Sequence, residues 1–203
     1  MRPRMRSVAE STTSCARRGS PDSSPYQAIG TRSGRACRRS RCRRCRSNPV
    51  GVAFITGSVS APGIVEAYEH RFPKDHPLRA LYVADVAGQQ KAAVNLLLHH
   101  GVRTCLEYQR TGDAAAARRL SNPDLAPHLA FLDMGGHGYA VLRLSADRVE
   151  CEFVCIPRPS EPTSERDGGP IRYRVVHRAA RWPSGGRPRL EQLVVEGDPD
   201  LAL

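Results

Sequence analysis

The stretch "GYAVLRLSADRVECEFVC", Gly138–Cys155, decides the fold, because apolar and polar side chains alternate along it with a period of two. Alternate residues of a strand point to opposite faces of a sheet. The apolar set on one predicted face is Ala140, Leu142, Leu144, Val149, Cys151, Phe153 and Cys155. The segment "SADR" in the middle is a turn. We therefore expect two antiparallel strands with one apolar face and one solvated face.

Two further strands follow the loop "RPSEPTSERDGGP". In the first of them, Tyr173, Val175 and His177 alternate with arginines at 172, 174 and 178. The second is the run "LEQLVVEG", residues 190–197. Short loops join the four segments, so the sequence predicts an antiparallel four-stranded meander.

Helices are predicted before the meander, after a buried strand at 49–58. Residues 87–111 are rich in helix formers, and Gly101 separates two helices there. Asp113 caps a third helix, "AAAARRL", which ends before Pro123. Helices followed by a meander give the α+β class.

The net charge of +11 comes entirely from the first quarter of the chain. Residues 1–50 hold thirteen Arg, no Lys and two acidic residues, whereas residues 51–203 hold eighteen basic and eighteen acidic residues. Large aliphatic residues are nearly missing from 1–48, so this segment is predicted to be disordered, with no core of its own. Residues 49–203 form the predicted domain.

Three interpretations of residues 1–48 remain open. Cys37, Cys42 and Cys45 have partial zinc spacing, with Cys15 as the fourth thiol, but no His lies between 23 and 69. The arginines would bind RNA or DNA through phosphates, although Lys is absent and Tyr26 is the only aromatic residue for stacking. The composition also fits an out-of-frame translation of GC-rich DNA, and this interpretation leads.

Two pairs of side chains in the body are candidates for chemical sites. Adjacent histidines at 99 and 100 point about 100° apart on a helix, so we expect them at a helix end rather than on a metal. Buried hydrophobic thiols are the favoured interpretation of Cys151 and Cys155.

The segment "NPDLAPHLAFLDMGGHGY" offers four metal-binding side chains, Asp124, His128, Asp133 and His137. The alternative, which we favour, is that residues 133–137 form a tight turn into the first meander strand.

No nucleophile elbow, phosphate-binding glycine loop or dinucleotide fingerprint is present in the sequence. No apolar run is long enough for a membrane span. The segment after Arg17-Arg18 is polar, whereas an export signal would have an apolar segment there. The residues alone assign no catalytic, cofactor-binding or metal-binding group.

Four segments resemble the C-terminal part of alkaline phosphatase D-type (PhoD-like) proteins, from about Pro49 to Leu203. They are "GVAFITGSVSAPGIVEAYEHRFPKDHPLRALYV", "NLLLHHGVRTCLEY", "LSNPDLAPHLAFLDMGGHGYAVLRLSADRVECEFVCIPRP" and "DGGPIRYRVVHRAARW…RPRLEQLVVEGDPDLAL". Their most specific portions are "NPDLAPHLAFLDMGGHGY", "EFVCIPRP" and "YRVVHRA". The resemblance implies an αββα metallophosphoesterase-like sandwich. It also implies hydrolysis of phosphate monoesters or diesters by a metal-bound hydroxide, with Ca, Fe or Zn as the metals.

The family's metal ligands lie upstream of the matched region, where residues 27–48 contain no Asp, Glu or His. We therefore expect a catalytically incomplete C-terminal fragment, from a family that is often exported. Its missing second sheet would leave the apolar face of the meander exposed, so that the chain would aggregate or be molten. The alternative function is a small polyanion-binding protein that uses the Arg-rich arm. The oligomeric state is left open.

Overall fold

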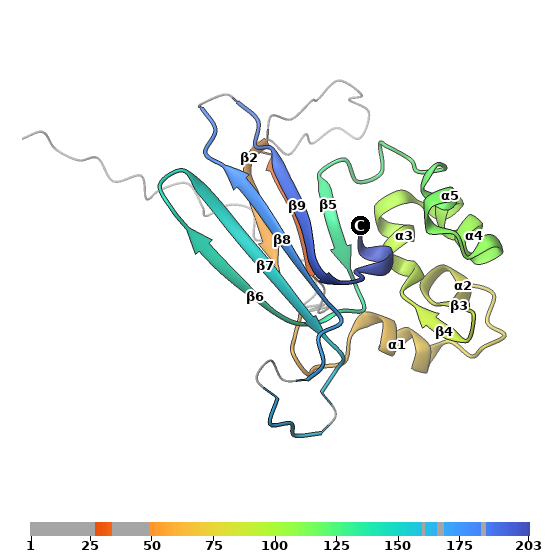
Figure 1. Cartoon of the computed structure of the whole chain (residues 1–203). Helices are drawn as coiled ribbons and strands as arrows, with labels where there is room; N and C mark the ends of the chain where they lie inside the picture. The colour runs from red at the N-terminus through yellow and green to blue at the C-terminus, as the bar shows by residue number, and fades with distance from the viewer. Residues whose placement is uncertain (1–26, 34–48, 160, 166–168, 184–185) are drawn as a thin grey trace, which may run out of the picture.

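The computed structural model describes residues 27–33, 49–159, 161–165, 169–183 and 186–203, with the backbone alone at 27–33, 49 and 50 (Figure 1). The described residues combine helices with antiparallel sheets, as the α+β class requires.

The predicted meander is confirmed as a four-stranded antiparallel sheet with the order β6-β7-β8-β9. Its strands are β6 (His137–Leu144), β7 (Arg148–Ile156), β8 (Tyr173–Ala180) and β9 (Leu190–Gly197). Alternation along β7 has the predicted phase, because Cys151, Phe153 and Cys155 are buried in one core cluster. The opposite face carries Glu150 and Glu152, which pair with arginines of β6 and β8.

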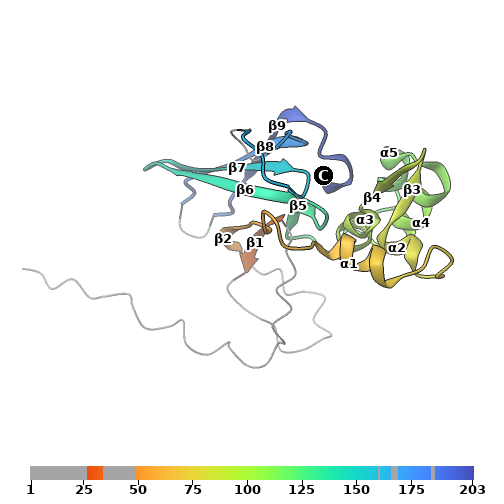
Figure 2. The ribbon, with the colours of Figure 1, turned by 90° about the horizontal axis from the view of Figure 1, so that it is seen from below.

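A second sheet covers the apolar face of the meander. It has the order β2-β1-β5, from β2 (Pro49–Ile55), β1 (Gln27–Ser33) and β5 (Leu129–Asp133). Figure 2 shows it as a layer beneath the four-stranded sheet. Phe131 of β5 is fully buried, and its ring centroid lies 5.6 Å from that of Phe153. The two sheets therefore enclose one core as a sandwich.

This arrangement corrects two expectations. The apolar face of the meander does not lack a covering layer, because β2 and β5 supply Val52, Phe54 and Phe131 to the same core. The prediction of disorder across 1–48 is wrong for β1, which pairs antiparallel with β2 on one edge and β5 on the other. Main-chain hydrogen bonds on both edges order a strand whose composition gives little sign of it. The rest of that segment, including its four cysteines, lies outside the described residues.

The helices lie together beside the sandwich, next to β5 (Figures 1 and 2). They are α1 (Ile64–Arg71), α2 (Arg79–Tyr82), α3 (Ala93–His100), α4 (Val102–Thr111) and α5 (Ala114–Arg118). Gly101, with φ of 102°, separates α3 from α4 as predicted. The Asp113 carboxylate accepts from the backbone N–H of Ala115 and Ala116, so the predicted cap is confirmed.

The start of the predicted helical stretch 87–111 is instead a small hairpin. Strands β3 (Ala84–Val86) and β4 (Gln89–Lys91) are joined by Ala87 and Gly88, whose φ angles are 51° and 77°. Two successive positive φ angles favour a hairpin turn over a helix. A short 3₁₀ helix, η1 (Asp200–Ala202), ends the chain and buries Leu201 and Ala202.

Among the helices that the structure describes, none combines the length and the apolar character needed to cross a bilayer.

Candidate functional site

The turn between β5 and β6 is organised by the Asp133 carboxylate, which is 7 % exposed. Its Oδ1 accepts a hydrogen bond from the backbone N–H of Gly135 at 2.9 Å, as expected for an Asp that begins a turn. A side chain at Gly136 would collide with the same carboxylate. The predicted tight turn into the first meander strand is therefore confirmed.

The same carboxylate joins three separate parts of the fold. The Tyr173 hydroxyl on β8 donates to Asp133 Oδ2 at 2.7 Å. Asn95 of α3 donates from Nδ2 to Oδ1 at 3.3 Å, and its own Oδ1 accepts from the Met134 backbone N–H at 2.8 Å. Burial raises the pKa of Tyr173 well above its usual value, and the Asp133 charge raises it further. The phenol therefore stays protonated and keeps donating.

His137 begins β6 and faces α1. Its Nε2 lies 3.3 Å from Glu66 Oε1, while Glu66 Oε2 accepts from the Gly63 backbone N–H at 2.7 Å. Glu66 thus caps α1 and contacts the imidazole at once. His137 is 3 % exposed, and within the described part of the chain its Nδ1 has no hydrogen-bond partner.

Arg158 approaches the same carboxylate from the end of β7. Its Nη1 lies 3.8 Å from Glu66 Oε2, and its Nε donates to the Ser60 carbonyl at 2.8 Å. The arginine is therefore held by main chain from the segment before α1.

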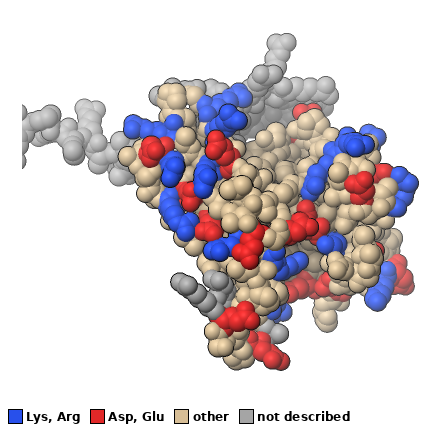
Figure 3. Space-filling view, in the orientation of Figure 1, with Lys and Arg blue, Asp and Glu red and all other residues tan. Residues whose placement is uncertain are grey.

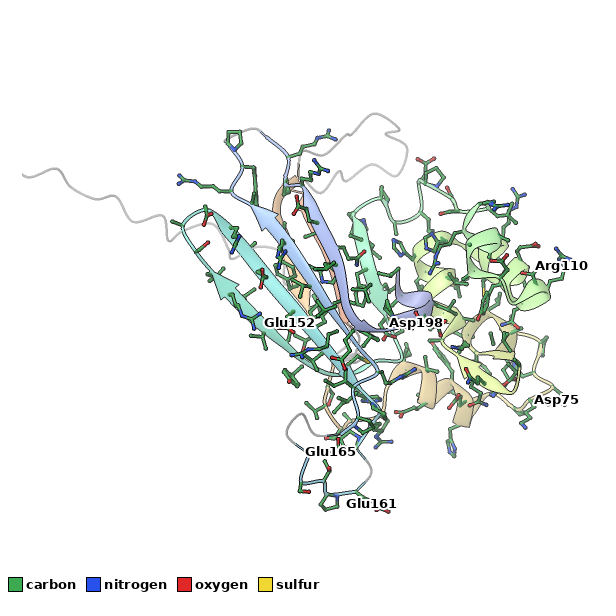
Figure 4. All side chains as sticks on the ribbon, viewed as in Figure 1. Asp75, Arg110, Glu152, Glu161, Glu165 and Asp198 are labelled. Atoms are coloured by element: carbon green, nitrogen blue, oxygen red, sulfur yellow. The ribbon has the colours of Figure 1, made fainter. Side chains whose placement is uncertain are left out.

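These groups line a polar pocket of about 370 Å³. Its charged lining residues are Glu66, Glu69, Lys91, Asp133, Arg158, Arg172, Asp198 and Asp200. Lys91 forms an ion pair of 3.0 Å with Asp200, whereas Arg172 is exposed and forms no ion pair among the described residues. Figure 4 labels Asp198 where β9 leads into η1. The pocket is thus lined both by a guanidinium outside any described ion pair and by a histidine–glutamate pair, a setting suited to a polar, charged ligand.

The four side chains considered for a metal do not form one site. Asp124 and His128 are exposed in the loop before β5, whereas Asp133 and His137 are buried after it. Both Asp133 oxygens already accept hydrogen bonds. Within the described ranges, no three His, Cys, Asp or Glu side chains are grouped so that they could hold a metal ion. This pocket therefore does not fit the metal centre that the family resemblance implies.

His99 and His100 lie at the end of α3, as expected, but bond in different directions. His99 Nε2 is 3.2 Å from the Leu129 carbonyl oxygen, and His100 Nδ1 is 3.0 Å from Ser121 Oγ. Both rings are half-buried, and burial lowers the pKa of each. His99 therefore connects α3 to the first residue of β5, and His100 connects it to the segment before β5, so the two rings do not share a ligand.

The described cysteines are buried thiols, as predicted for Cys151 and Cys155. Burial raises the thiol pKa of Cys105, Cys151 and Cys155 to about 11 in each case. A thiol with such a pKa is protonated near neutral pH and is a poor nucleophile.

Sequence reasoning missed most of the pocket. It named Asp133 and His137 but not Glu66, Asn95 or Arg158. One signal was available, because Asn95 interrupts the apolar run "AAVNLLL". A polar residue on the buried side of a helix requires partners.

Comparison with known proteins adds no relative: no family model, no curated protein and no solved structure matches this chain.

Proposed function

We propose that this chain is the C-terminal portion of a PhoD-like phosphatase, and that its polar pocket binds the phosphate ester. One observation carries the proposal. The segments that bear the family resemblance are far apart in the sequence, yet each contributes to this pocket. In chain order, the four segments supply Glu66, then Asn95, then the turn 133–137 together with Arg158, and finally Tyr173.

Arg172 and Arg158 are the phosphate contacts in this proposal. A guanidinium presents several N–H donors in a plane and suits phosphate oxygens. Arg172 is the stronger candidate because it has no ion pair among the described residues, whereas Arg158 is shared with Glu66. Lys91 is already paired with Asp200 and is assigned a structural role.

Hydrolysis is not assigned to this chain by itself. In the family that it resembles, bound metal ions would supply the nucleophile and stabilise charge on the phosphoryl oxygens, and the residues that would hold them lie in upstream motifs. The pocket described above supplies a positively charged contact but no set of metal ligands among the described residues. We therefore expect the chain to bind a phosphate ester without hydrolysing it.

Binding is tested by titrating p-nitrophenyl phosphate into the full chain and recording heat or amide chemical shifts. Arg172→Gln is expected to weaken binding about tenfold, because one charge-assisted contact is lost. Arg181→Gln is the matched control, since Arg181 is also exposed and does not line the pocket. Equal binding by both variants, or no binding at all, would count against the pocket.

Hydrolysis is tested separately with p-nitrophenyl phosphate and its bis-ester, with Ca²⁺ and either Fe³⁺ or Zn²⁺ added. We expect no release of nitrophenol above the metal-only background. Turnover that Arg172→Gln reduces would show that the chain is a complete enzyme.

The second candidate function rests on the charge distribution alone. All of the excess positive charge lies in residues 1–50, which is the pattern of a polyanion-binding arm. Fluorescence anisotropy with a short labelled RNA and a DNA of the same length tests this function. Binding that weakens steeply with salt, and that disappears when the seven arginines between residues 34 and 48 are replaced by Gln, would support it.

A further inference from the structure

The outer face of the four-stranded sheet carries a row of charges that alternates from strand to strand. Arg143, Glu150, Arg178 and Glu191 face one another in register across β6, β7, β8 and β9. Arg143 Nη1 lies 3.5 Å from Glu150 Oε1, and Arg178 Nε lies 2.6 Å from Glu150 Oε2. Figure 3 shows the alternating blue and red side chains over this sheet.

This row ends with opposite charges at the two edges. Arg143 lies on β6, and Glu191 lies on β9 and forms no ion pair in the part of the chain that the structure describes. Each edge strand has eight residues and contains no proline, and within its sheet each pairs on one side only. Their outer main-chain N–H and C=O groups are available to another strand, except the Gly138 N–H of β6, which donates to the Ser58 carbonyl at 3.4 Å.

The neighbouring rows end in apolar side chains. On the inner face, one row runs from Leu144 on β6 to Leu190 on β9, and Leu144 is 74 % exposed. On the outer face, another runs from Val141 to Leu193, which is 51 % exposed. Leucines at the open ends of two rows are thus left in contact with water.

We infer that β9 of one copy of this chain pairs with β6 of a second copy and so continues the sheet. Strands alternate in direction across the meander, so β6 of a second copy placed beside β9 is antiparallel to it. With Glu191 opposite Arg143 of the second copy, Leu190 faces Leu144 and Leu193 faces Val141. An apolar row is thus continued by an apolar side chain, and the charged row by a side chain of opposite charge. The complementary charges of Glu191 and Arg143 therefore favour a second copy of this chain as the partner of the β9 edge.

Such an interface joins two different edges, so it leaves a free edge at each end of the assembly. Sedimentation equilibrium of the full chain should therefore give a weight-average mass that rises with concentration past the dimer. A monomer at all concentrations up to about 100 µM, or a mass that stops at the dimer, would overturn the inference.

Charge reversal tests the register. Glu191→Arg should weaken association about three- to tenfold, because it places a second guanidinium opposite Arg143 of the next copy. The Glu191→Arg substitution breaks no ion pair among the described residues of its own copy. Glu161→Arg is the matched control, because Figure 4 shows Glu161 on the loop after β7, away from both edges. Equal association by the two variants would overturn the pairing.

Complementation gives the sharpest test. Arg143→Glu should associate weakly by itself, but a mixture of Arg143→Glu with Glu191→Arg should recover association, because the interface between the two altered edges again carries opposite charges. Arg143 also pairs with Glu150 and Glu152 inside its own copy, so each variant's melting curve is recorded first. If Arg143→Glu does not fold, Leu144→Lys at the same edge is used instead and should weaken association. A mixture no stronger than its components, or an unaffected Leu144→Lys, would contradict the proposed interface.

Discussion

Tyr173 donates a hydrogen bond of 2.7 Å to Asp133 and thereby joins the four-stranded sheet to the end of β5 in the other sheet. Both side chains are buried, so the bond is shielded from water. The carboxylate it reaches also holds the β5–β6 turn and the α3 amide of Asn95. The buried Asp133 carboxylate therefore connects the two sheets, the helices and the pocket.

Tyr173→Phe keeps the ring but removes this donor. The Asp133 carboxylate then loses one of its partners while it stays buried, so the free energy of unfolding should fall by about 1–3 kcal/mol. Urea unfolding at neutral pH measures the change. A decrease below about 0.5 kcal/mol would show that another donor replaces the phenol.

Asn95→Ala removes both the donor to Asp133 and the acceptor for the Met134 N–H. Because buried polar groups on both sides of the amide lose a partner, we expect a destabilisation of about 2–3 kcal/mol. Asn122→Ala is the control, since the Asn122 side chain makes an exposed bond, to the Asp124 N–H. Similar losses in the two variants would mean that the buried network contributes little.

The sequence was sufficient to predict the meander because its alternation is strong and local. Apolar and polar residues alternate around Phe153 on β7, and each neighbouring strand that pairs with β7 lies close to it in the sequence. It was insufficient for β1, whose position between β2 and β5 is set by main-chain pairing across distant segments. The same reason hid the pocket, because Asn95 and Asp133 are 38 residues apart and Tyr173 is a further 40 away.

Phe153→Ala tests whether the second sheet closes the core. Phe153 is fully buried against Phe131, so its removal should cost about 3–5 kcal/mol. Leu144→Ala on the same face of the sheet, at an exposed position, should cost less than about 0.5 kcal/mol. Urea unfolding of the two variants compares them. If both losses are small, the face of the meander is not covered by β2 and β5 in solution.

His177 predicts an acid-dependent loss of stability. The ring is fully buried near Phe131 and Phe153, its Nε2 lies 2.8 Å from Gln192 Nε2, and burial lowers its pKa from 6.5 to about 4. The folded state therefore favours the neutral ring. The stability that depends on the neutral His177 ring is fully present above pH 6.5. The free energy of unfolding then decreases as the pH falls from 6.5 toward 4, because the unfolded chain takes up the proton first.

The expected loss reaches about 3 kcal/mol at the acid end of that range, and His177→Leu should remove it. The measurement is the urea midpoint at pH 7 and pH 4.5 for the native chain and this variant. His99 and His100 also have lowered pKa values, so only the difference between the two proteins reports on His177. If His177→Leu loses stability in acid as steeply as the native chain, the buried ring is not the group that titrates.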